Sequence, residues 1–154
     1  MNLDFSTQAH YLWAMLPEVV LSVWAMLVLL VDVFQKGSRS EPSRPVVVVL
    51  SLVGIVLTAV ANETTTSGMI ALDSFRIFTN FVILLAAALF VLIAPRYLEG
   101  ERMQYGEIYA LVLFAAVGMM VFAGSRDLMV IFIGLELMSV AVYVLTGANR
   151  RDPR

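Results

Sequence analysis

Cysteine is absent from this sequence of 154 residues, and charge is scarce, since only 14% of the residues are Asp, Glu, Lys or Arg. Without cysteine the chain can form neither disulfides nor thiolate-ligated iron–sulfur or zinc sites. Its single histidine, His10, lies outside the apolar runs, so we expect no metal or redox centre in this chain. A basic cluster with interleaved aromatic residues is also missing and the net charge is only -2, which argues against nucleic acid as a partner.

Apolar residues, by contrast, make up 60% of the sequence, against about 45–50% in soluble domains. This composition predicts a membrane protein. The leading segment "MNLDFSTQAHYLWAML" holds no Lys or Arg, and the apolar run that it opens exceeds the core of about 7–15 residues typical of a cleavable signal peptide. We therefore expect this run to be retained as a helix.

The apolar runs predict an all-α, polytopic membrane protein with a single membrane domain. A helix needs about 20 mostly apolar residues to cross a bilayer. Five segments meet this requirement, at about 12–34, 45–62, 74–97, 107–124 and 127–148. Pro17 falls in the first turn of the first helix, and Pro95 is expected to mark the fraying end of the third. Only "SRD" separates the last two helices, which predicts a tight antiparallel pair.

The basic residues of the connecting segments predict the orientation, because Lys and Arg accumulate on the cytoplasmic side. With the N-terminus outside, only Arg76 and Arg126 fall on the outer side. The other eight fall on the inner side: Lys36, Arg39, Arg44, Arg96, Arg102, Arg150, Arg151 and Arg154. We therefore expect the N-terminus outside and the C-terminus in the cytoplasm, with "ETTTSGMIALDSF" forming an outer surface loop or hairpin.

Most polar residues of the spans have simple structural interpretations. Glu18 and Asp32 lie near opposite ends of the first helix, where each carboxylate is expected to reach interfacial water. Arg76 opens the third helix and is expected to extend to the outer interface, where it can pair with Asp73. Glu107 opens the fourth helix, where the helix dipole favours an acid, and a supporting role at a cytoplasmic proton entry is the alternative.

Glu136 differs from these residues because it lies about nine residues into the fifth helix, about 13 Å along its axis. A charge at that depth costs about 2.5–3.5 kcal/mol on insertion scales, so such residues normally face protein or water. A carboxyl group held there is a candidate proton relay. A glutamate that only hydrogen-bonds a neighbouring helix is the structural alternative.

Helical spacing places Ser139 and Tyr143 on the same stripe as Glu136, and we expect that stripe to face the inside of the bundle. These two residues are candidates to support the acid or to hold water beside it. The other side of the helix is apolar and suits lipid or helix packing. No Lys, Arg or His lies deep in any span, so a cation that pairs with Glu136 is expected beyond residue 154 or on another subunit.

The stretch "GEIYALVLFAAVGMMVFAGSRDLMVIFIGLELMSVAVYVL", residues 106–145, resembles the antiporter-like subunit N of bacterial proton-pumping NADH:quinone oxidoreductase (complex I). Subunit N is related to mitochondrial NADH dehydrogenase subunit 2. The order and spacing of "EIYALVLF", "GM", "DL", "GLELMS" and "YVL" carry the resemblance. The segments "LPEVVLSVWAMLVLLVD" and "ALDSFRIFTNFVILLAA" extend it more loosely into the preceding helices.

The resemblance implies that Glu136 pairs with a lysine on a later, broken helix, and that the pair takes part in proton translocation coupled to electron transfer from NADH to quinone. It implies a non-redox subunit of this translocase, multi-pass in the bacterial inner membrane, with the other complex I membrane subunits and the lipid bilayer as partners. The chain itself would hold no cofactor, and FMN, iron–sulfur clusters and quinone would belong to partner subunits. Family members commonly have proline where this chain has Ala141, so a kink near Glu136 is expected to be weaker or absent.

The family fold has many more helices than five. The resemblance therefore implies an N-terminal fragment or a truncated product of subunit N, which is not expected to pump protons by itself. Two other interpretations stay open at this point. The chain could be a subunit of a multisubunit cation/proton antiporter, in which Glu136 serves exchange without NADH, or a membrane scaffold without a transport role.

Overall fold

The structure, a computed structural model, describes residues 15–36, 44–61, 74–100 and 106–147. His10, Asp73 and most of the predicted outer loop lie outside these residues. The described part of the chain forms five helices: α2 (Leu16–Lys36), α3 (Arg44–Val60), α4 (Ser74–Gly100), α5 (Glu107–Gly124) and α6 (Leu128–Gly147). The predicted all-α fold is confirmed, and the helix bounds lie within a few residues of those expected from hydropathy.

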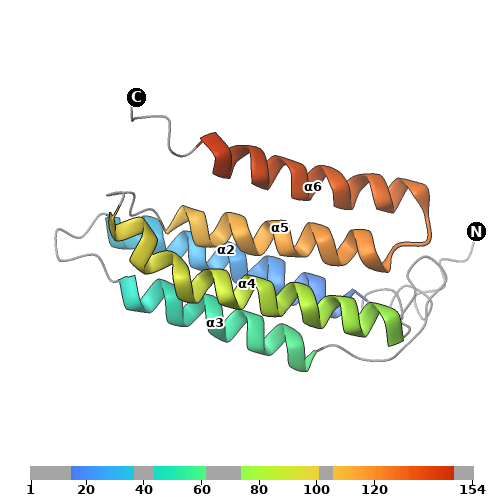
Figure 1. The fold of residues 1–154 in the computed structure, drawn as a ribbon, viewed down its shortest axis with the longest axis horizontal. Coiled ribbons are helices and arrows are strands. Elements are labelled where there is room, and N and C mark those ends of the chain that lie inside the picture. Colours follow the sequence, from blue (N-terminus) through green and yellow to red (C-terminus); the bar gives the residue numbers. More distant parts are fainter. Residues whose placement is uncertain (1–14, 37–43, 62–73, 101–105, 148–154) are drawn as a thin grey trace, which may run out of the picture.

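Successive helices run in opposite directions, with their axes roughly parallel (Figure 1). Helix α5 is the centre of the arrangement, since it contacts α2, α3, α4 and α6. Among the described helices, α6 packs on α5 alone, which confirms the predicted antiparallel pair. The position of α6 relative to the bundle is therefore fixed through α5.

Four helices are long and apolar enough to cross a membrane, namely α2, α4, α5 and α6. Helix α3 is apolar but has 17 residues, about 26 Å at 1.5 Å per residue, slightly short of a typical hydrocarbon core. The chain is a multi-pass membrane protein. One expectation was wrong: Pro95 does not end its helix, because α4 continues through it to Gly100. A transmembrane helix tolerates the lost backbone bond where neighbouring groups satisfy the freed carbonyl.

The core follows single stripes on α2 and α4. On α2 the buried stripe runs through Glu18, Leu21, Ala25 and Val28, at spacings of three and four residues. On α4 the stripe begins with Arg76 and Asn80 and continues in apolar residues, Leu84, Ala87, Val91, Ala94 and Leu98. These spacings place each set on one helix face. Both buried stripes therefore begin with polar residues, at the end of the bundle where α2 and α4 start.

A close contact joins α2 to α3. The indole nitrogen of Trp24 donates a hydrogen bond to the carbonyl of Leu50 at 2.6 Å. Gly54 makes room for the ring, because a Cβ atom there would lie 2.6 Å from Trp24 Cγ, below any normal contact. The hydrogen bond from Trp24 to Leu50 and the close packing of the Trp24 ring on Gly54 together hold α3 against α2.

Candidate functional site

Small residues set the contact between α5 and α6. A Cβ atom at Gly118 would lie 2.6 Å from the backbone nitrogen of Met138, and one at Gly134 would lie 2.8 Å from that of Phe122. Ala141, two turns after Gly134, is also buried. Small residues let membrane helices approach backbone to backbone, and this close packing replaces the hydrophobic drive that lipid removes. The α6 surface at Gly134 and Ala141 is therefore its inner face.

Glu136 lies on the other side of α6. Two residues after Gly134 correspond to a rotation of about 200° around a helix of 3.6 residues per turn. Accordingly Glu136 is exposed within this chain, as is Tyr143 at 72%, while Ser139 is half-buried. The expectation that their stripe faces the inside of this bundle was wrong for the described helices. The reason is that Gly134 and Ala141, rather than the polar residues, fit against α5.

The exposed glutamate is not at a helix end. Glu136 is the ninth residue of the 20-residue α6, about 12–13 Å from its start. Hydrocarbon is a poor solvent for a carboxyl group, which in membrane helices faces protein or water. Among the described helices α6 contacts α5 alone, so a partner for Glu136 would come from outside the described part of the chain.

Glu107 does not join Glu136. It is the first residue of α5 and is exposed, whereas Glu136 lies near the middle of α6. The antiparallel arrangement puts the start of α5 beside the end of α6 (Figure 1). An acid in the first turn of α5 is favoured by the helix dipole, as the sequence predicted. The structure brings the two glutamates to different levels of the helix pair.

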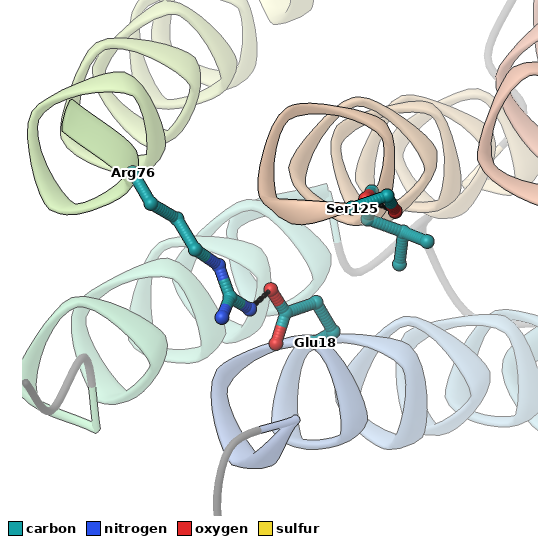
Figure 2. A network of polar contacts seen from close by, with 4 residues as sticks. Glu18, Arg76 and Ser125 are labelled. Carbon is teal, nitrogen blue, oxygen red and sulfur yellow. Dashed lines mark hydrogen bonds and ion pairs between the residues drawn. The ribbon is translucent and has the colours of Figure 1, made fainter. Parts of the chain in front are cut away.

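The described residues instead pair two charges that sequence reasoning had assigned to the interface. A guanidinium nitrogen of Arg76 donates to the Oε1 atom of Glu18 in a salt bridge between α4 and α2 (Figure 2). Both side chains are buried, at 1% and 2% exposure. The expectation that Glu18 reaches interfacial water and Arg76 the outer interface was wrong. Each residue lies on the core stripe of its helix, so its side chain turns inward.

A sequence signal for this pair existed. Glu18 is the third residue of α2 and Arg76 the third of α4, two helices that start at the same end of the bundle. Opposite charges at equal depth within one helix bundle are natural partners in a low-dielectric setting. The helix order alone did not show that α2 and α4 turn these faces toward each other.

The end of α5 completes the surroundings of Arg76. A Cβ atom at Gly124 would lie 2.8 Å from Arg76 Cδ and 2.9 Å from Cζ. Figure 2 also draws Ser125, the residue that follows this glycine. The Ser125 hydroxyl donates to the carbonyl of Val121 and so closes the last turn of α5. The salt bridge therefore ties together the starts of α2 and α4 and the end of α5.

Known proteins similar to this chain are subunits of one enzyme. NADH-quinone oxidoreductase subunit N of Trichlorobacter lovleyi is 46% identical over 142 residues, which cover 88% of this chain and 28% of that protein. Subunit N 1 of Herpetosiphon aurantiacus is 42% identical, over 82% of this chain and 26% of its own length. Subunit N of Gemmatimonas aurantiaca is 41% identical, over 98% and 32% respectively. No protein-family model matches the chain.

The chain spans less than a third of the length of these relatives and matches their N-terminal part. The predicted resemblance is thereby confirmed, and the similarity extends well beyond residues 106–145, on which it was mainly based. Along most of its length, the chain is similar to the N-terminal part of NADH-quinone oxidoreductase subunit N.

Proposed function

We propose that this chain is part of a membrane subunit of proton-pumping NADH:quinone oxidoreductase and takes part in proton translocation driven by electron transfer from NADH to quinone. It acts beside the other membrane subunits of that complex in a bacterial inner membrane. FMN, iron–sulfur clusters and quinone are bound by partner subunits, and this chain contributes no redox step. The similarity to subunit N supports the complex, and Glu136 supports the proton step.

One observation carries the proton-relay role: Glu136 is a carboxyl group in the middle of an apolar helix, on the face that α5 leaves uncovered. A residue with this placement is available to a partner in a further membrane segment. A carboxyl group exchanges protons readily, and a cation near it favours the charged form, so movement of the cation drives release or uptake. Ser139 and Tyr143 are the neighbouring groups on α6 that could hold water or bond to the acid.

The experiment replaces Glu136 in the complete oxidoreductase. In inverted membrane vesicles, Glu136→Gln should reduce NADH-driven acidification of the lumen by about tenfold or more, in line with loss of a proton-transferring group. Glu136→Asp, which keeps a carboxyl group on a shorter stem, should retain intermediate activity. Wild-type acidification in the Gln variant would contradict the relay role. Gradient formation on Na⁺ addition without NADH would favour a cation/proton antiporter instead.

A further inference from the structure

We propose that Asp32 and Arg76 are positioning residues that fix the height of α5 in the membrane, and through α5 the height of Glu136. This inference rests on the proposed function only for its catalytic consequence. Its structural part concerns the two ends of the central helix. We call the contact of Arg76 with Gly124 the C-terminal clamp, and the contact of Asp32 with Gly106 the N-terminal clamp.

The C-terminal clamp places a cation against the last turn of α5. Arg76 packs so closely on Gly124 that any side chain there would overlap it. A flexible arginine normally swings away from such an obstacle. Here Glu18 holds the guanidinium, and the side chain is only 1% exposed, so the space for such a movement is missing.

The N-terminal clamp places an anion against the start of α5. A Cβ atom at Gly106, which caps α5, would lie 2.8 Å from Asp32 Cβ and closer still to its carboxylate. Because the overlap reaches Asp32 Cβ, rotation of the carboxylate alone cannot relieve it. Asp32 follows Val28 by one turn on α2, so both acids of α2, Glu18 and Asp32, extend the same core stripe.

The signs of the two clamps match the polarity of α5. The start of a helix carries partial positive charge and its end partial negative charge. Asp32 lies at the start and Arg76 at the end, and both come from other helices. A shift of α5 along its axis would therefore move its backbone ends relative to the charges that hold them.

The position of α5 is passed on to α6. Their backbones are in direct contact at Gly118 and Gly134, and only residues 125–127 connect them. Among the described helices no other one contacts α6. The depth of Glu136 therefore follows the depth of α5. Apolar contacts between α5 and its neighbours can form again after α5 shifts slightly along its axis. The two clamps, by contrast, allow only one position of α5 along that axis.

The test introduces a methyl group at each clamp without removing a charge. Gly124→Ala and Gly106→Ala are compared with Gly147→Ala, a matched control on α6 where a Cβ atom meets nothing within 4 Å. All three are made in the complete oxidoreductase. The chain has no cysteine, so Met129→Cys, at the exposed start of α6, provides one labelling site in it.

The first measurement is the rate at which Cys at position 129 reacts with a membrane-impermeant maleimide, read on this chain after separation of the subunits. Each clamp variant should change that rate beyond the scatter of the Gly147→Ala control. The second is the number of protons translocated per electron. It should fall below the value of the Gly147→Ala control while NADH oxidation continues, because misplacing a reacting group by about 1 Å can slow its reaction by about 10²-fold.

Labelling rates equal to the control in both clamp variants would overturn the inference, whatever the result of Glu136→Gln. Altered labelling with unaltered proton stoichiometry would leave the clamps in place but reject their role in positioning Glu136. If Gly124→Ala prevents assembly, the Arg76→Lys variant is tested in its place. Lysine keeps the positive charge but lacks the planar guanidinium group that lies on Gly124. Unchanged labelling in Arg76→Lys would likewise reject the C-terminal clamp.

Discussion

The buried salt bridge between Glu18 and Arg76 shows how much the meaning of a charged residue depends on its helix face. Both residues lie near the ends of their helices, where long side chains commonly reach water. Both nevertheless belong to core stripes and are almost fully buried. Such a pair stabilises the fold only as a pair, because each partner compensates the desolvation of the other.

Breaking this pair on one side should be costly. Arg76→Met leaves a buried carboxylate without its cation, and the expected loss is about 3–5 kcal/mol of unfolding free energy. The double variant Glu18→Leu/Arg76→Met removes both charges and should recover most of that loss. Unfolding of the purified chain in mixed micelles, followed by circular dichroism, measures both. A double variant as unstable as the single one would show that the charges are not coupled.

The contact between α2 and α3 offers a second test at this scale. Trp24→Phe keeps an aromatic ring beside Gly54 but removes the indole donor to Leu50. The expected cost is about 0.5–1.5 kcal/mol, the net value of one hydrogen bond. Gly54→Ala should cost more, because its methyl group would overlap the ring. The same unfolding assay compares the two variants. A Gly54→Ala chain as stable as wild type would show that the Trp24 ring does not require glycine at position 54.

At the scale of elements, two glycines decide how α6 is oriented. Gly118 and Gly134 face backbone atoms of the opposite helix, and backbone cannot move aside as a side-chain tip can. This contact turns Gly134 and Ala141 inward, and it leaves Glu136 on the uncovered face. Ala141 lies inside the continuous α6, at the position where the family that this chain resembles commonly has proline.

Gly118→Ala and Gly134→Ala should each separate α5 from α6. The expected cost is about 1–3 kcal/mol, typical of an overfilled contact. Gly147→Ala makes the same chemical change in open space and should leave stability within about 0.5 kcal/mol of wild type. Disulfide formation between cysteines placed across the two helices, at Ala115 and Ala141, reports the separation. Equal cross-linking in all three variants would show that the glycines do not set the contact.

Hydropathy predicted the helices well because each is an apolar run between more polar segments. The bounds of α5 were predicted to the residue, and its pairing with α6 followed from the three-residue connection. The inward faces were harder to predict. Helices α5 and α6 are apolar on nearly every side, so the sequence contains little contrast between the protein and lipid faces. The one polar stripe of α6 was assigned inward, and packing of small residues decided otherwise.

For the candidate site, sequence reasoning identified Glu136 but not its surroundings. An acidic residue in the middle of an apolar run is evident from the sequence alone. The Glu18–Arg76 pair was missed because α2 and α4 do not pack directly on each other, and the chain order does not show that the long Arg76 side chain reaches Glu18. Pro95 was misjudged for a related reason, since helix termination by proline is weaker where surrounding helices support the segment.

At the scale of the whole molecule, the charge distribution still predicts an orientation. Arg126, in the connection between α5 and α6, should face outside, and Arg150 should face the cytoplasm. In intact cells, Arg126→Cys should react with a membrane-impermeant maleimide, whereas Arg150→Cys should react only after the membrane is opened. Protection of position 126 together with reactivity of position 150 would reverse the assignment.

The bundle as a whole presents α6 as its free side. Helix α6 contacts only α5 among the described helices, and it carries the mid-membrane acid on its outer face. In the proposed function, that face meets the cation that moves Glu136 between its charged and protonated forms. The buried core beneath it supplies a fixed support, with the clamps at both ends of α5.

The most direct test of this account is the number of protons moved per electron by the complete oxidoreductase in proteoliposomes, with Glu136→Gln compared with wild type and with Glu136→Asp. The Gln variant should assemble and still oxidise NADH in the presence of an uncoupler, but it should move fewer protons per electron, with the Asp variant between the two. A Gln variant that matches wild type in both rate and proton stoichiometry would contradict it.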